Sequence, residues 1–137
     1  MRRTAILLTT VSLAVGAFGC SKSYDEKAKD CATALTKRTG GDSADKPTVS
    51  EAEERVDAFD KTLADMARRG YESVANDALS KAEQKTEAGG KSRPEACEPL
   101  SKHDYTALLM AKSLDGLGWT GKGGEFDKLK MVKGLGD

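Results

Sequence analysis

Ser101, His103 and Asp104 are the three residue types of a hydrolytic triad, and they lie within one short stretch of the chain. A triad needs a serine nucleophile, a histidine base and an acid whose side chains converge on one point. At the start of a helix, residues one and two positions apart point in different directions around the axis, so these three do not converge. We therefore expect His103, the only histidine, to be solvent-exposed, and we predict no catalytic residue. A single histidine cannot supply a site built from several histidines, and we predict no bound metal.

Residues 116–124 form a glycine-rich segment that partly matches the phosphate-binding P-loop. Gly116, Gly121 and Lys122 have the spacing of the two glycines and the lysine of that motif. Gly123, however, stands where the motif requires a serine or threonine to hold magnesium. The segment also follows an expected helix, whereas a P-loop follows a strand. We therefore predict that the chain binds no nucleotide and no cofactor.

Trp119, the only tryptophan, lies among the glycines of this segment and has two interpretations. Tryptophan is enriched in the energetic centres of protein interfaces, so an exposed Trp119 would mark a contact with a partner. Alternatively, the indole folds back and closes the end of a helical bundle, and the glycines permit the turns that this needs. A calcium-binding EF-hand that begins at Asp115 is excluded, because Leu117 and Trp119 stand where oxygen ligands are required. The exposure of the indole distinguishes the two interpretations.

The three cysteines are Cys20, Cys31 and Cys97. Cys31 and Cys97 lack the Cys-X-X-Cys spacing of redox-active pairs, so we expect them to form a structural disulfide. This pairing leaves Cys20 as an odd thiol, which would be a liability in an oxidising compartment. A covalent role of its own for Cys20 would explain the odd count.

Residues 1–19 have the layout of a secretory signal peptide. Arg2 and Arg3 give a short positive start, and no charged residue occurs from Thr4 to Gly19. This uncharged segment is shorter than the roughly 20 predominantly apolar residues of a membrane-spanning helix. We therefore expect residues 1–19 to be removed during export.

The end of this segment, Ala17-Phe18-Gly19-Cys20, resembles the lipobox of bacterial lipoproteins. In a lipobox, small residues precede a cysteine that is acylated and becomes the first residue of the mature protein. Gly19 and Cys20 fit the pattern, whereas Ala17 stands where a larger aliphatic residue is commoner. The resemblance implies that Cys20 carries the lipid. The alternative is an ordinary signal peptide cut near Ala17 or Gly19, which would leave Cys20 as a free thiol.

The whole layout is similar to that of small lipoproteins of high-GC Gram-positive bacteria, with a signal, a lipobox and a short domain rich in alanine, glycine and lysine. Only residues 1–20 carry a specific motif, and most such proteins have no assigned activity, so the resemblance implies no catalytic residue. It implies a lipid anchor at Cys20 on the extracytoplasmic face of the cell membrane. Each methylene of the acyl chains that is buried in the bilayer contributes about 0.8 kcal/mol to the free energy of membrane binding. Residues 20–23 would be the tether. Because three extended residues span about 10 Å, the domain at residues 24–137 would lie close to the membrane.

The processed chain, residues 20–137, has the length of one domain with a modest core. The full sequence has 22 Lys and Arg against 22 Asp and Glu, and two arginines would leave with the signal peptide. The slightly acidic remainder gives no reason to expect nucleic-acid binding, which usually needs a clearly basic face. The processed chain has no isoleucine, few valines and abundant alanine, lysine and glutamate, a composition that favours helices over strands.

Apolar residues recur at helical spacing through residues 24–137. Residues 24–38 form one such pattern, which places Cys31 on the inner face. A second helix is predicted to begin at Ser50, whose spacing from Glu53 is that of a capping box. It should end at Gly70, where the apolar face shifts; this shift predicts either a bent continuation or a hairpin.

The second half of the chain contains three further helical patterns. One helix is predicted from Tyr71 to the glycines at 89–90, and the next should be capped by Ser101 and Asp104. A short terminal helix should end at Gly134 and carry three apolar residues, Phe126, Leu129 and Val132. We therefore expect an all-α fold, a small bundle of four or five helices stabilised by one disulfide. The chain-entropy model assigns about 4 kcal/mol to a bridge between Cys31 and Cys97.

These features favour a non-enzymatic function. The leading hypothesis is a membrane-tethered module that binds or modulates another envelope or secreted protein, with the membrane itself as a second partner through Cys20. A small-ligand binding protein is an alternative, and an enclosed apolar cavity would favour it. A cell-wall hydrolase is a weaker alternative, which would require converging carboxylates in a pocket.

Overall fold

Five α-helices and one 3-10 turn follow one another along residues 23–136, the part of the chain that the computed structural model describes. The elements are α1 (Tyr24–Thr39), α2 (Val49–Arg68), α3 (Glu72–Gly89), η1 (Glu95–Cys97), α4 (Lys102–Gly116) and α5 (Lys128–Leu135). The predicted all-α fold with one disulfide is confirmed. The predicted signal peptide, the lipobox and Cys20 lie outside the described residues. Among the helices of residues 23–136, none is both long and apolar enough to cross a membrane.

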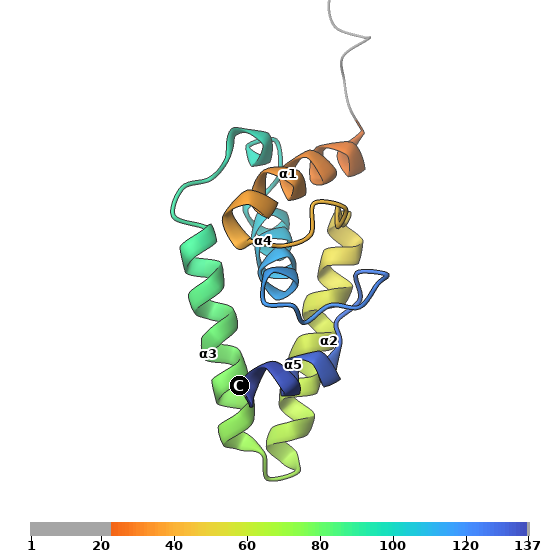
Figure 1. Cartoon of the computed structure of the whole chain (residues 1–137). Helices are drawn as coiled ribbons and strands as arrows, with labels where there is room; N and C mark the ends of the chain where they lie inside the picture. The colour runs from red at the N-terminus through yellow and green to blue at the C-terminus, as the bar shows by residue number, and fades with distance from the viewer. Residues whose placement is uncertain (1–22, 137) are drawn as a thin grey trace, which may run out of the picture.

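Helix α4 is the centre of the bundle. It packs against α1, α2 and α3, and α1 lies across the end of the bundle at which the described chain begins (Figure 1). Helices α2 and α3 form an antiparallel hairpin, and α5 lies across the half of this hairpin that is far from α1 (Figure 1). The chain reverses at Gly70, whose φ of 92° is a conformation that favours glycine. Of the two possibilities that the shift at Gly70 left open, the hairpin is therefore the correct one.

The buried apolar side chains form two clusters along α4. The first cluster lies between α1, α2 and the first half of α4, around the disulfide, and it includes Leu35, Ala52 and Leu108. The second lies between α2, α3 and α5, and it includes Phe59, Leu114 and Met131. The two clusters span the length of α4, which explains why this helix is predominantly buried.

The start of α2 differs from the prediction by two residues. Thr48 is the N-cap, and a capping box joins it to Glu51 rather than joining Ser50 to Glu53. Both pairs fit the same sequence pattern, so spacing alone does not choose between them. The earlier start is favoured because it brings Val49 into the helix, where its side chain packs against the first cluster.

The terminal helix α5 differs from the predicted one in its bounds, and two of the apolar residues assigned to it are exposed. Leu129 and Val132 are 76% and 43% exposed, whereas Met131 is fully buried. The cause is the N-cap Asp127, whose backbone amide donates to the Trp119 carbonyl at 2.7 Å and so fixes the rotation of α5. The helix also continues beyond Gly134, to Leu135. Phe126, which was predicted to be part of the helix, precedes it. Its side chain is partly buried and packs edge-on against the ring of Phe59.

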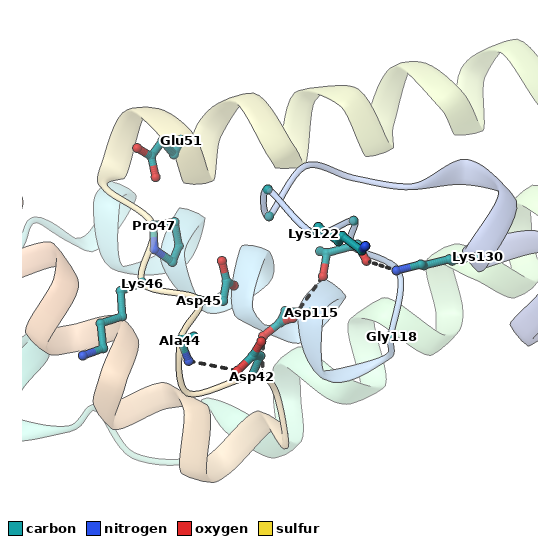
Figure 2. Close-up of a pocket in the computed structure, with 14 residues that line it drawn as sticks. Asp42, Ala44, Asp45, Lys46, Pro47, Glu51, Asp115, Gly118, Lys122 and Lys130 are labelled. Carbon is teal, nitrogen blue, oxygen red and sulfur yellow. Dashed lines mark hydrogen bonds between the residues drawn. The ribbon is translucent and has the colours of Figure 1, made fainter.

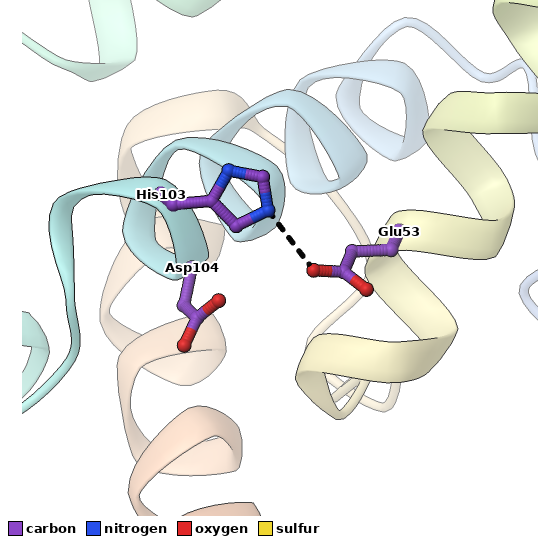
Figure 3. Close-up of side chains that lie close together, drawn as sticks. All are labelled: Glu53, His103 and Asp104. Atoms are coloured by element: carbon purple, nitrogen blue, oxygen red, sulfur yellow. Dashed lines mark hydrogen bonds and ion pairs between the residues drawn. The ribbon is translucent and has the colours of Figure 1, made fainter.

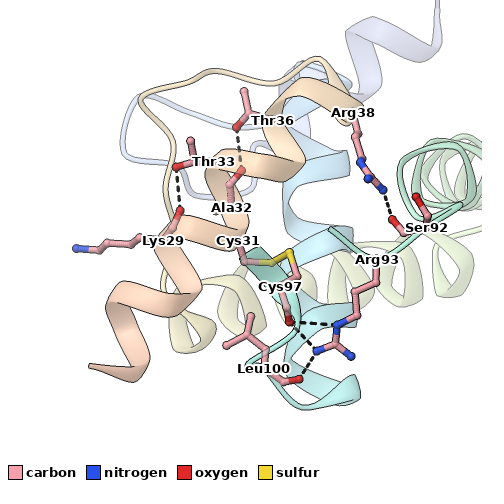
Figure 4. The surroundings of a disulfide bond; sticks show 10 residues. All are labelled: Lys29, Cys31, Ala32, Thr33, Thr36, Arg38, Ser92, Arg93, Cys97 and Leu100. Carbon is pink, nitrogen blue, oxygen red and sulfur yellow. Dashed lines mark hydrogen bonds between the residues drawn. A yellow bond between two sulfur atoms is a disulfide. The ribbon is translucent and has the colours of Figure 1, made fainter. Parts of the chain in front are cut away.

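The predicted disulfide between Cys31 and Cys97 joins α1 to η1, just ahead of α4 (Figure 4). Both cysteines are fully buried, and their Cα atoms are 4.5 Å apart. The guanidinium of Arg93 donates to the carbonyls of Cys97 and Leu100, which holds the connector around the bridge (Figure 4). The disulfide therefore links segments that are 66 residues apart in sequence to the same end of the bundle.

Reduction of this disulfide should lower the melting temperature by more than about 10 °C, because about 4 kcal/mol is a large part of the stability of a domain of this size. Circular dichroism melts of a Cys20→Ser chain, which keeps only the Cys31–Cys97 pair, would measure the change with and without reductant. Equal melting temperatures, with thiol titration proving that the bridge was first formed and then reduced, would refute a stabilising role.

Candidate functional site

Trp119 is 2% exposed and belongs to the second core cluster. Gly118, with a φ of 80°, turns the chain back after α4, and the Trp119 amide donates to the Leu114 carbonyl at 3.0 Å. The indole lies 6.2 Å from the ring of Phe59, measured between centroids. The partner-contact interpretation is therefore contradicted, and the alternative, in which the indole closes the bundle, agrees with the structure.

Two glycines of the glycine-rich segment allow close packing within the fold. A Cβ atom on Gly116 would lie 2.0 Å from the Thr39 carbonyl oxygen, so this glycine allows the end of α4 to touch the end of α1. Gly124 has a φ of 84°, and a Cβ atom there would lie 2.8 Å from the Arg55 guanidinium. Both glycines are explained by contacts within the fold.

Two cations that sequence reasoning missed are buried beneath this segment. Lys112 of α4 is fully buried, and its Nζ atom lies 3.0 Å from an oxygen of Asp115 and 3.3 Å from an oxygen of Asp45. The same Nζ donates to the carbonyls of Asp42 and Asp45 at 3.0 and 2.7 Å. Arg55 of α2, which is 4% exposed, makes two 2.8 Å hydrogen bonds to the carboxylate of Asp45. Asp45, Arg55, Lys112 and Asp115 are called the buried ion cluster below.

The charges within the buried ion cluster are balanced, with two cations and two anions. Burial alone would raise the pKa of Asp45, but the hydrogen bond and charge of Arg55, followed by those of Lys112, outweigh it and hold this pKa below its ordinary value. Asp45 therefore stays ionised at neutral pH. Asp45 and Asp115 both bind the Lys112 ammonium, so both carboxylates help to hold this buried cation in place.

A polar cleft of about 500 Å³ opens above the buried ion cluster, between the α1–α2 loop and the glycine-rich segment (Figure 2). Its rim carries charges of both signs, including Glu51, Lys46 and Lys122. Lys130 donates to the Thr120 carbonyl at 2.8 Å, so this ammonium is used to hold the cleft wall (Figure 2). The cleft is polar and open to solvent, unlike the enclosed apolar cavity that would favour a small-ligand binding protein.

A second depression, of about 420 Å³, runs between α2 and α4. Helix α2 contributes residues at positions 53, 56, 57 and 60, and α4 contributes residues at 103, 106, 107 and 110. Each set has the i, i+3, i+4, i+7 spacing of one helical face. Val56, Ala107 and Met110 are its apolar residues, and its carboxylates, all on α2, are Glu53, Asp57 and Asp60. This depression is called the acid-walled groove below.

The carboxylates of the acid-walled groove are crowded. Burial, followed by the charge of Asp57, raises the pKa of Asp60 above its ordinary value. Asp57 itself is paired with Lys61 at 2.7 Å, and both of these side chains are more than half exposed. Because a nearby positive charge would relieve the repulsion between Asp57 and Asp60, the groove is suited to a cationic ligand.

His103 lies at one end of the acid-walled groove and is 80% exposed, as the sequence predicted. Its Nε2 atom is 3.1 Å from Oε1 of Glu53, and the carboxylate of Asp104 lies beside them (Figure 3). The hydroxyl of Tyr24, at the start of α1, donates to the other side of this group, at Oδ2 of Asp104. Ser101 does not join a triad, because its hydroxyl accepts from the Asp104 amide as the helix cap.

Asp45→Asn should lower the free energy of unfolding by about 3 kcal/mol at pH 7, because it leaves two buried cations short of one anion. The folded-state pKa of Asp45 is depressed, so its contribution is fully present above the unfolded-state pKa and is lost as the pH falls through the folded-state value. The variant should therefore lose less stability than the parent on acidification below about pH 4.

Urea unfolding between pH 7 and pH 2 measures both effects, with Asp77→Asn, an exposed position on α3, as the matched control. If Asp45→Asn unfolded at the same urea concentration as Asp77→Asn at pH 7, the buried ion cluster would not be stabilising in the way described.

No family model, curated protein or solved structure matches this chain.

Proposed function

We propose that this protein is a lipid-anchored module of the cell envelope, exposed on the extracytoplasmic face, which binds a basic segment of another envelope or secreted protein in the acid-walled groove. The proposal joins two independent parts, the anchor and the binding surface. The residues before the described domain support the anchor, and the groove supports the binding surface.

The anchor is supported by the lipobox at Ala17-Phe18-Gly19-Cys20 together with the start of the fold. Helix α1 begins at Tyr24 and is capped by Ser23, whose side chain accepts from the Glu26 amide. Only three residues therefore separate Cys20 from the first helix. Acyl chains on Cys20 would hold the domain within about 10 Å of the bilayer surface.

The observation that carries the binding function is the acid-walled groove itself. Two packed helices present matching stripes of four residues each, with apolar residues in the groove and carboxylates along the α2 side. An amphipathic helix binds such a groove by placing apolar side chains on the apolar residues, which are Val56, Ala107 and Met110. Lysine or arginine side chains on the same helix would neutralise Asp57 and Asp60. The proposed partner segment is therefore amphipathic and basic.

The polar cleft supports a second candidate function, the binding of a small polar molecule. Its walls combine the ammonium groups of Lys46 and Lys122 with the carboxylates of Glu51 and Asp42. Such a mixture suits a zwitterion or a polyhydroxylated molecule better than a peptide helix. Variants of the acid-walled groove would leave this function unchanged, which separates the two candidates.

Cys20→Ser should move the protein from the membrane fraction to the soluble fraction of cells and should abolish incorporation of radiolabelled palmitate. The reason is that this cysteine is the proposed site of acylation, and the described helices offer no membrane span. Fractionation followed by immunoblotting checks the first result, and autoradiography checks the second. A Cys20→Ser protein that still carried label would place the lipid elsewhere.

Asp57→Lys combined with Asp60→Lys should abolish binding of a labelled amphipathic peptide of leucine and lysine, because the charge of the groove is reversed. Fluorescence anisotropy measures this, and binding to the parent should weaken at high salt. Glu72→Lys combined with Asp77→Lys makes the same change in charge on α3 and should retain binding.

The same pair of variants tests the function in cells by cross-linking and mass spectrometry. A protein captured by the parent and by the α3 variant, but lost with the groove variant, would support the proposal. Equal peptide binding by the two variants, or equal capture by them, would contradict the groove as the binding surface.

A further inference from the structure

Glu53, His103 and Asp104 place three potential metal ligands together at the end of the acid-walled groove (Figure 3). One donor atom from each residue lies within 4.8 Å of the other two. The Nε2 atom of His103 and Oε1 of Glu53 are already 3.1 Å apart. Ligand atoms bound to one tetrahedral Zn²⁺ ion are separated by about 3.4 Å, since each bond is about 2.1 Å long. Glu53 and His103 are exposed, so their side chains have room to rotate toward a shared metal ion.

We infer that Glu53, His103 and Asp104 form a binding site for a divalent transition-metal ion of the Zn²⁺ type. One imidazole nitrogen and two carboxylate oxygens are a donor set that Zn²⁺ accepts. Ca²⁺ needs six to eight oxygen ligands, and Mg²⁺ prefers an all-oxygen octahedron, so neither suits this group. Two carboxylates beside a neutral imidazole also carry a net charge of minus two, which a divalent cation neutralises.

The fold holds the three ligands on rigid elements. Glu53 is on α2, and His103 and Asp104 are in the first turn of α4, the helix against which α2 packs. The Tyr24 hydroxyl donates to Oδ2 of Asp104, which orients this carboxylate and leaves Oδ1 for the metal ion. Hydrogen bonds of this kind to a ligand typically change metal affinity by about 10-fold to 100-fold. Tyr24 is thus a positioning residue of the site.

The site is accessible to ions from solvent. The side chains of His103 and Glu53 are 80% and 49% exposed, so no part of the fold needs to open. Three protein ligands leave a fourth coordination position of Zn²⁺ for water or for a side chain of another molecule. The inference does not rest on the proposed peptide binding, because the metal ion alone is the probe.

The test uses the full chain with Cys20→Ser, so that this thiol offers no ligand, with the disulfide intact and without a histidine tag, in mild detergent. Isothermal titration with ZnCl₂ should show one ion bound per chain, and the melting temperature should rise with Zn²⁺ concentration. MgCl₂ at the same concentrations should have neither effect. Because His103 is the only histidine, the imidazole signals in the NMR spectrum belong to it, and they should shift on Zn²⁺ addition.

Variants then identify the ligands. His103→Ala should abolish binding, and it should fold normally because the side chain is exposed, which circular dichroism verifies. Tyr24→Phe should weaken binding by about 10-fold, through Asp104. Asp77→Asn, at an exposed position on α3 outside the groove and the three ligands, is the matched control and should bind as the parent does. Absence of 1:1 binding, unmoved imidazole signals or equal affinity of His103→Ala and the parent would each overturn the inference.

Discussion

The fully buried ammonium of Lys112 is the constraint on which the arrangement of this bundle depends. An ammonium removed from water is tolerated only where oxygen atoms replace its hydration. Here the Lys112 ammonium donates to oxygen atoms of the α1–α2 loop and of Asp115, all within 3.3 Å. The loop must therefore fold over α4 in one way. Since Arg55 of α2 binds the same Asp45 carboxylate and also donates to the Ala111 carbonyl of α4, the loop, α2 and α4 are fixed relative to one another.

This constraint determines the surface as well as the interior. In the sequence of α2, Arg55 falls between the groove residues Glu53 and Val56, but its side chain is buried against Asp45 and α4. Lys112 follows the last groove residue of α4, Met110, by two positions. A shift of α2 along α4 would therefore break the bidentate contact between Arg55 and Asp45 and would also separate Glu53 from His103. Apolar packing alone tolerates such shifts better, because dispersion contacts have little directionality. The buried ion cluster thus sets the register of the groove, while the disulfide holds α1 to the same end of the bundle.

Local features of this fold could be predicted from the sequence, whereas contacts between helices could not. Ser101 caps α4 as predicted, and Cys31 faces inward, because cap chemistry and helical periodicity act over a few neighbouring residues. The inner face of α5 could not be predicted, since the rotation of this helix depends on a hydrogen bond between Asp127 and Trp119, which precedes the helix by several residues. Lys112 carried one overlooked signal: it is a charged residue next to Ala111 and close in sequence to Leu108, Leu109 and Leu114.

The candidate site was beyond sequence reasoning for a related reason. Glu53 and His103 are 50 positions apart, and neither has a local pattern that points to the other. His103 was correctly predicted to be exposed, but exposure does not exclude chemistry when a second helix brings a carboxylate within 3.1 Å. The predicted absence of a metal site considered only several histidines, and a mixed set of ligands from two helices becomes visible only once α2 and α4 are paired.

The position of Tyr24 connects the proposed anchor to the proposed binding surface. This residue begins α1, directly after the tether, and its hydroxyl binds Asp104 at the end of the acid-walled groove. With Cys20 in the membrane, that end of the groove would lie near the lipid surface, because the intervening residues reach only about 10 Å. A partner bound along α2 and α4 would then have one end near the bilayer surface and would extend away from it. Tethering would raise the effective concentration of the groove for partners that are also bound to the membrane. A shallow, open groove of modest affinity would then be enough to bind such a partner.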